Sequence, residues 1–289
     1  MYPESRPSTR CRVIPVMGLI ASSRLPAVLL CFTYYECYRT KRPSGLYNKF
    51  MARSASAPLR NHLLTALPAP DLRRLQRDLQ LVVLPLGESV FESGSEQRHL
   101  YFPASGIISL LQLMENGASG EIAVVGNEGV VGIALFMGGG TSPSRAVVQS
   151  AVTAYRLRAE LVHKEFRRGG ALQRLLLRYM QALLVQMSQT AVCNRCHSTR
   201  QQFSRWLLMS LDRLPSNEIL MTQELIANML GVRREAVTDA ARALQDDRLI
   251  RYVRGRIEVL DRPGLEKRVC ECYGVVKAEY QRLLVALAE

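Results

Sequence analysis

The sequence lacks the patterns that mark most enzymes and membrane proteins. Its four histidines are scattered over 289 residues, and it has no nucleophile elbow, phosphate-binding loop or HExxH segment. No apolar run is long enough to span a bilayer. Its seven cysteines form no even framework of the disulfide-rich kind, which indicates reduced thiols. These absences predict a protein that is not an enzyme, has no membrane partner and works in the cytoplasm.

Acidic residues are few relative to basic ones. The chain has 38 Lys and Arg against 25 Asp and Glu, a formal net charge of +13, which favours a polyanionic partner. The excess is uneven, because residues 1–58 alone carry a net charge of +7. That segment mixes short apolar runs with prolines and charges, and Met51 opens a stretch typical of a natural start. We expect residues 1–58 to be a disordered extension or a misassigned start, with a secretory signal or an interfacial membrane anchor as alternatives.

Residues 223–244, QELIANMLGVRREAVTDAARAL, have the pattern of two short helices joined by a tight turn. Thr222 is a candidate N-cap for the first helix. Ala227 is small where two such helices would touch, and Gly231 tolerates a positive φ at the turn. Apolar residues at three- to four-residue spacing continue the buried face of the second helix. The segment predicts a helix-turn-helix whose second helix enters a DNA major groove.

A strand pattern follows directly in residues 249–260. Apolar and polar residues alternate on both sides of Arg254-Gly255, as in a β-hairpin with a tight turn. A hairpin in this place is a wing. Arg251, Arg254 and Arg256 are expected to meet the DNA phosphates there. The alternative is a solvated hairpin whose arginines only keep a sheet edge soluble.

Upstream, residues 81–157 contain short apolar runs separated by glycines. Such runs, about ten residues apart, are typical of an antiparallel roll or barrel. The glycines expected in its turns are Gly87, Gly94, Gly106, Gly120, Gly126 and Gly132. Residues 61–79 are expected to form a short helical lead-in, with Asp71 capping a helix.

Residues 169–200 predict one long helix with two apolar stripes. The first stripe contains Leu172, Leu176, Tyr179 and Leu183, and the second contains Leu177, Met180, Leu184, Met187 and Ala191. A helix that is apolar on two faces buries one face in its own domain and the other on a partner. We therefore expect a homodimer, which presents two recognition helices to two DNA half-sites.

The roll, the long helix and the winged helix-turn-helix together resemble the Crp/Fnr family of bacterial transcription regulators, over about residues 59–289. The most specific part is GVRREAVT, residues 231–238, which is similar to the family's G-x-S-R-E-x-V recognition helix. The resemblance implies an α+β fold with a cyclic-nucleotide-binding-like double-stranded β-roll at 59–168. A dimerisation helix and hinge at 169–209 and a winged helix-turn-helix at 210–289 would follow. It also implies double-stranded DNA, a second copy of the chain and RNA polymerase as partners.

In the family, Arg and Glu of this helix read base edges, so Arg234 and Glu235 are expected to contact bases. Their chemistry agrees, because Arg pairs with guanine O6 and N7 and Glu accepts from cytosine N4. Arg233 replaces the usual serine and is expected at a phosphate, while Asp239 stands where many members carry a second Arg. The half-site sequence is therefore not carried over. The expected DNA-contacting residues are Thr222, Gln223, Arg233, Arg234, Glu235, Thr238, Arg242 and Arg254.

The roll resembles a cyclic-nucleotide-binding domain with an altered pocket. The family's nucleotide binders carry a Gly-Glu pair that holds the ribose and an Arg-Ser pair that holds the cyclic phosphate. Here the matching pairs are Gly132-Ile133 and Ser144-Arg145. The acid is missing, and the reversed order turns the arginine to the other face of a strand. We expect these four residues to form a degenerate effector pocket that does not bind cyclic nucleotides, with cyclic AMP as the alternative and the effector unidentified.

Two cysteine groups have ligand-compatible chemistry for zinc or iron–sulfur: Cys193-Asn-Arg-Cys196-His197 and Cys270-Glu-Cys272. Family members with a redox cluster hold it in an N-terminal group, whose spacing the three cysteines before residue 40 do not match. Buried cysteines that pack as small hydrophobes explain both groups. The expectation is no cofactor and no metal, with Cys193, Cys196 and His197 as the candidates should a metal bind.

A rival function belongs to a different class of protein. The chain would then be a signalling module whose roll binds a cyclic nucleotide or responds to redox state or metal, and which docks a protein partner. Binding of duplex DNA that weakens with salt separates the regulator from this module.

Overall fold

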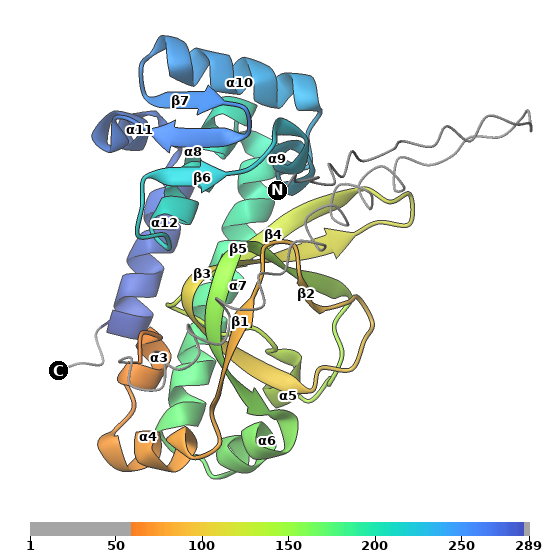
Figure 1. Ribbon diagram of the computed structural model, residues 1–289, viewed down its shortest axis with the longest axis vertical. Coiled ribbons are helices and arrows are strands. Elements are labelled where there is room, and N and C mark those ends of the chain that lie inside the picture. Colours follow the sequence, from red (N-terminus) through yellow and green to blue (C-terminus); the bar gives the residue numbers. More distant parts are fainter. Residues whose placement is uncertain (1–58, 286–289) are drawn as a thin grey trace, which may run out of the picture. The chain divides into compact units, whose positions relative to one another are not determined.

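The computed structural model describes residues 59–285 (Figure 1). The expectations for residues 1–58 lie outside the described residues, and so do those for the last four residues. None of the described helices combines the length and the apolar character that crossing a bilayer requires.

An antiparallel sheet forms the first half of the described chain. Its strands are β1 (Gln80–Leu84), β2 (Ser89–Phe91), β3 (His99–Leu113), β4 (Ser119–Val125) and β5 (Ser144–Arg158). The order is β1-β5-β3-β4, and β2 also pairs with β5. Residues with no exposed surface, such as Leu100, Phe102 and Ile107, lie inside this roll. The helices α5 (Ala134–Met137) and α6 (Ala159–Arg167) flank its strands.

The expectation of uniformly short strands was wrong for β3 and β5, which have 15 residues each. Gly106 lies inside β3 and not in a turn, at a φ of +76°. The β3–β5 register shifts around it, and a Cβ atom here would lie 2.2 Å from the carbonyl oxygen of Ala151. A glycine thus serves as a bulge that lets one long strand bend. Gly120 likewise lies inside β4.

Two short helices precede the sheet, α3 (His62–Thr65) and α4 (Ala69–Gln76). The Asn61 side chain caps α3, and Pro68 occupies the N-cap of α4. The expected capping role of Asp71 was therefore wrong. Asp71 lies in the first turn of α4, where its carboxylate pairs with Arg74 at 2.7 Å.

The predicted long helix is α7 (Ala171–Cys196). Its C-cap residue is His197, so it ends before residue 200. A new helix, α8 (Thr199–Leu211), begins after a capping box between Ser198 and Gln201. The first apolar stripe of α7 is buried within the chain, at 0–3% exposure. The second is divided: Leu177 and Leu184 are 52% and 56% exposed, whereas Met180 is only 7% exposed.

Gln186 explains how α7 is held against the sheet. It has no exposed surface, and its side-chain oxygen accepts from the Val124 amide at 2.9 Å. Its side-chain nitrogen donates to the Val124 carbonyl at 3.2 Å and to the Tyr280 hydroxyl at 2.8 Å. Because β4 is the edge strand, this amide satisfies backbone groups that no further strand reaches.

The C-terminal part contains three strands, four α-helices and a π-helical turn. Its elements are β6 (Glu218–Leu220), α9 (Gln223–Leu230), α10 (Arg234–Asp246), β7 (Ile250–Val253), β8 (Arg256–Val259), α11 (Arg262–Arg268), α12 (Glu271–Tyr280) and a π-helical turn (Gln281–Val285). The sheet order is β6-β8-β7. Helix α12 runs back along α7 (Figure 1).

Candidate nucleic-acid interface

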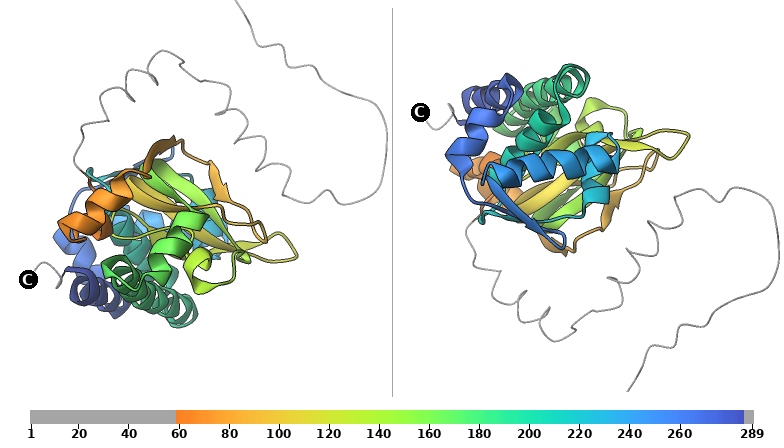
Figure 2. Two further views of the ribbon diagram at one scale, coloured as in Figure 1. Left: turned by 90° about the horizontal axis from the view of Figure 1, so that it is seen from below. Right: turned by 90° about the horizontal axis from the view of Figure 1, so that it is seen from above.

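The turn between α9 and α10 has the geometry that the sequence predicts. The Thr222 hydroxyl caps α9 by accepting from the Leu225 amide at 3.3 Å. Gly231 ends that helix in the left-handed region, with φ 66° and ψ 33°. Arg233 is the extended N-cap residue of α10, so the second helix begins within two residues of the turn. Helix α10 lies in front of the other elements when the structure is seen from above (Figure 2).

Helix α10 separates an apolar face from a charged one. Its buried residues are Val237, Ala240, Ala241 and Leu244, all at 5% exposure or less. Arg233, Arg234 and Glu235 are exposed at its first turn, and neither arginine has a carboxylate partner among residues 59–285. Arg242, two turns further on, lies 3.9 Å from the Asp239 carboxylate. The start of α10 therefore carries unpaired cations beside one acceptor.

Thr238 and Gln223, both expected to contact DNA, are bonded to each other. The Thr238 hydroxyl donates to the Gln223 side-chain oxygen at 2.9 Å. The Gln223 NH2 group keeps its donors free for an outside acceptor. This contact fixes the side-chain orientation of Gln223 from the neighbouring helix.

The wing is a tight hairpin, as predicted. Arg254 and Gly255 both have positive φ, 50° and 79°, which is the signature of a type I′ turn. The Gly255 carbonyl accepts from the Met221 amide at 2.8 Å, which ties the hairpin to the residue before the cap of α9. The wing therefore has a fixed position relative to the helix pair.

The three wing arginines are not equivalent. Arg251 pairs with Glu258, and Arg256 pairs with Glu218 at 2.8 Å. Arg254 has no carboxylate partner in the described part of the chain and is exposed. Of the three arginines, Arg254 is therefore the one whose guanidinium has no carboxylate partner among the described residues to compete with a phosphate.

Tyr252 and Gln245 hold the wing against α10, and the sequence analysis did not identify them. The Tyr252 hydroxyl donates to the Met221 carbonyl at 2.7 Å, and its amide donates to the Gln245 side chain at 2.8 Å. Burial raises the pKa of Tyr252 to about 12, so this hydroxyl keeps its proton. Only the tyrosine's place in an alternating strand could have suggested that it packs inward.

The four effector-pocket candidates have structural partners of their own. Gly132 has a φ of +111°, and a Cβ atom there would lie 2.7 Å from the His99 carbonyl. Ile133 is half-buried before α5, and the Ser144 hydroxyl is buried against that of Ser142 at 2.7 Å. Arg145 pairs with Glu92 at 3.0 Å, so its charge is already neutralised.

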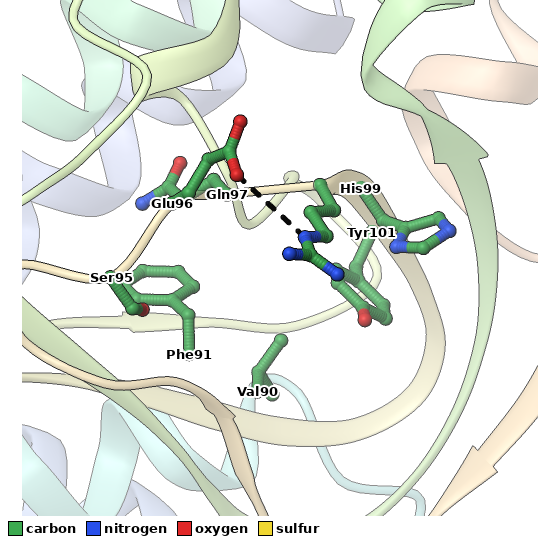
Figure 3. Close-up of a pocket in the computed structure, with 8 residues that line it drawn as sticks. Val90, Phe91, Ser95, Glu96, Gln97, His99 and Tyr101 are labelled. Atoms are coloured by element: carbon green, nitrogen blue, oxygen red, sulfur yellow. Dashed lines mark ion pairs between the residues drawn. The ribbon is translucent and has the colours of Figure 1, made fainter.

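A hollow of about 210 Å³ lies beside β2 and the start of β3 (Figure 3). Its lining includes Phe91, Gln97, His99 and Tyr101, and an ion pair joins Arg98 to Glu96 at 3.7 Å. None of the four effector-pocket candidates lines it.

The two cysteine groups meet in space. Cys193 and His197, at the end of α7, lie against Cys270 and Cys272, at the start of α12. Cys196 is exposed and is not part of this group. The Cys193 and Cys270 sulfurs lie 3.6 Å apart, and hydrogen bonding between them raises the pKa of Cys193 and lowers that of Cys270. From the sequence, Cys193 and His197 were candidates together with Cys196, and Cys270 and Cys272 were a separate group.

Two segments of the chain match family descriptions. Residues 81–168 match the cyclic nucleotide-binding domain, and residues 201–268 match the Crp-like helix-turn-helix domain. This pairing, in this order, decides the assignment. The chain belongs to the Crp/Fnr family. Crp/Fnr proteins are DNA-binding transcriptional regulators and not enzymes, so the sequence-based expectations of family, α+β fold and non-enzymatic function are confirmed.

Solved structures of Crp/Fnr regulators share the fold at low identity. A putative regulator from Eubacterium rectale ATCC 33656 has 18% identity and a TM-score of 0.58, covering 71% of this chain and 96% of that one. FixK2 from Bradyrhizobium japonicum has 15% identity and a TM-score of 0.56, covering 66% and 98%. The c-di-GMP responsive regulator CLP from Xanthomonas campestris has 16% identity and a TM-score of 0.55, covering 67% and 100%. No curated protein sequence matches the chain.

Proposed function

We propose that this Crp/Fnr regulator reads a specific duplex DNA site as a homodimer, with α10 in the major groove and without binding a cyclic nucleotide. The observation that carries the proposal is the first turn of α10. Arg233 and Arg234 are exposed there without carboxylate partners among the described residues, on a helix whose opposite face is fully buried.

Each exposed group at this turn has a matching partner on DNA. Arg234 donates two parallel hydrogen bonds to guanine O6 and N7, and Glu235 accepts from cytosine N4. Arg233, the N-cap residue at the start of α10, neutralises a phosphate. The Asp239 carboxylate lies 3.9 Å from the Arg242 guanidinium and pairs with it only weakly. Arg242 therefore contacts DNA at the edge of the interface.

Two further elements place the helix on the duplex. Thr222 and Gln223 start α9, where unsatisfied amides favour a phosphate. Arg254 of the wing adds a phosphate contact on the flank. These contacts fix orientation without reading sequence.

The proposed dimer uses the exposed part of α7. Leu177 and Leu184 are exposed and seven residues apart, half-buried Met187 follows at the next step, and Val192 is 52% exposed. A helix of 26 residues is about 39 Å long, which suffices for a two-helix seam. The proposed division is a sensor roll at 59–168, a dimerisation helix and hinge at 169–209, and a DNA-binding part at 210–289.

The proposal that the roll binds no cyclic nucleotide rests on two side chains that cannot hold one. Ile133 offers no acceptor for a ribose, and Glu92 occupies the Arg145 guanidinium that a cyclic phosphate would need. The roll therefore keeps the family fold with another effector or none. RNA polymerase, in the cytoplasm, is the proposed third partner.

Selection of bound duplexes from a random pool, followed by binding at several salt concentrations, tests the proposal. A two-fold symmetric consensus with half-sites about one helical turn apart is expected. Binding of all duplexes with equal affinity would contradict it, and so would retention of a protein partner with no DNA.

A further inference from the structure

Four ligand-type atoms converge at the junction of α7, α8 and α12. They are the sulfurs of Cys193, Cys270 and Cys272 and a ring nitrogen of His197, and all lie within 4.8 Å of one another. The three cysteines are at most 4% exposed. They come from segments more than 70 residues apart, so the fold, and not a local motif, assembles them.

We propose that Cys193, His197, Cys270 and Cys272 bind one zinc ion in a tetrahedral Cys3His site that links the end of α7 to the start of α12. The first support is the spacing of the ligand atoms. The Cys193 and Cys270 sulfurs are 3.6 Å apart, and so are the Cys272 sulfur and His197 Nδ1. Bonds of about 2.3 Å to sulfur and about 2.0 Å to nitrogen imply tetrahedral edges of about 3.8 Å between two sulfurs and about 3.5 Å between sulfur and nitrogen.

The second support is the orientation of the histidine. While Nδ1 of His197 faces the sulfurs, Nε2 lies 3.4 Å from the Glu271 carboxylate. A carboxylate on the outer nitrogen is the usual partner of a metal-bound histidine, because it fixes the tautomer and ring orientation. Packing of cysteines as small hydrophobes explains the three sulfurs but gives no reason for this arrangement.

Charge balance agrees with a divalent ion. Three thiolates and one Zn²⁺ have a net charge of −1. The buried Arg205 guanidinium acts electrostatically on Cys193 and Cys272, and it donates to Thr190 at 3.1 Å. An iron–sulfur cluster distributes its ligands over several irons, which requires a wider set than these four atoms form. A disulfide would require two of the sulfurs to approach to about 2.05 Å.

The site would fix the angle between α7 and α8, the two helices that connect the roll to the helix-turn-helix. His197 is the residue at which α7 ends, and its carbonyl accepts from Gln202 of α8 at 2.8 Å. Helix α8 in turn packs against α10. A bound ion therefore fixes the direction in which α8 leaves α7.

Zinc analysis of the full chain, purified under reducing conditions without chelator, tests the site. About one zinc per chain is expected by mass spectrometry. Cys272→Ser should lose most of the zinc, while Cys196→Ser, which changes an exposed cysteine at the end of α7, should keep it. Co²⁺ added to metal-free protein should give the thiolate-to-cobalt absorption of a tetrahedral site.

Two further variants separate loss of the zinc site from loss of folding. Glu271→Gln changes an exposed side chain and should weaken zinc binding by roughly 10-fold or more, since it removes only the partner of the histidine. His197→Cys should retain one zinc in a four-cysteine site. Equal zinc in wild type and Cys272→Ser would overturn the proposal, as would wild-type protein that takes up neither zinc nor cobalt, or a native Cys193–Cys270 disulfide.

Discussion

A carboxyl group buried between the roll and α8 makes stability depend on pH. Glu121 of β4 is only 9% exposed, and burial raises its pKa from 4.5 to about 7. Ser109, Trp206 and the guanidinium groups of Arg205 and Arg213 lower the pKa, but less than burial raises it. The folded chain therefore retains a proton that the unfolded chain releases.

The sign and size of this pH dependence follow from proton linkage. Between about pH 4.5 and pH 7 the unfolded state binds fewer protons, so the free energy of unfolding falls as pH rises through that window. Below the window both states are protonated, and above it both are ionised, so the loss is then constant. A rise of about 2.5 pKa units corresponds to about 3 kcal/mol. Glu121→Gln, which has no charge to bury, should recover stability of this order above pH 7 and little at pH 4.5.

The chain has one tryptophan, Trp206, which is 3% exposed and adjoins Glu121, so its fluorescence reports urea unfolding at the site itself. Glu115→Gln, on an exposed residue of the same β-hairpin, is the matched control and should follow the wild-type curve. A Glu121→Gln gain that is equal at pH 5 and pH 8 would refute the reasoning, because the carboxyl would then be ionised in the folded state throughout.

Three further predictions concern dimerisation, the effector and the wing. Leu184→Glu changes a side chain that is 56% exposed, so the chain should stay folded but sediment as a monomer and bind DNA more weakly; a wild-type monomer at micromolar concentration would rule out the dimer. Cyclic AMP or cyclic GMP should give no heat of binding in calorimetry, because Glu92 neutralises Arg145; a micromolar dissociation constant would contradict this. Arg254→Ala should weaken binding to all sequences about equally and lower the salt slope by about one ion, whereas Arg251→Ala, whose guanidinium is already paired with Glu258, should change the slope less.

Features that depend on local backbone chemistry could be predicted from the sequence. Thr222 is a cap and Gly231 a left-handed turn because both roles are settled within four residues. The wing turn at Arg254-Gly255 is local in the same sense. These signals sufficed for the helix pair, the wing and the family.

Features that depend on distant segments could not be predicted. Met180 looked free for a partner but is only 7% exposed within the chain, and the return of α12 along α7 had no signal in the spacing of the stripe. Gly106 looked like a turn but is a bulge inside β3, which only its closeness to Ala151 reveals. Cys270 and Cys272 meet His197 only through the folded C-terminal part, so spacing along the chain gave no signal.

The central claim is that the start of α10 reads base sequence. Comparing the duplexes selected by wild type and by Arg234→Ala tests it most directly, because Arg234 is exposed and unpaired among residues 59–285, so its loss should leave folding intact. The account predicts a loss of roughly 1–3 kcal/mol on the preferred site and relaxed selectivity at one base position in each half-site. Unchanged affinity together with an unchanged consensus would show that α10 is not the recognition helix.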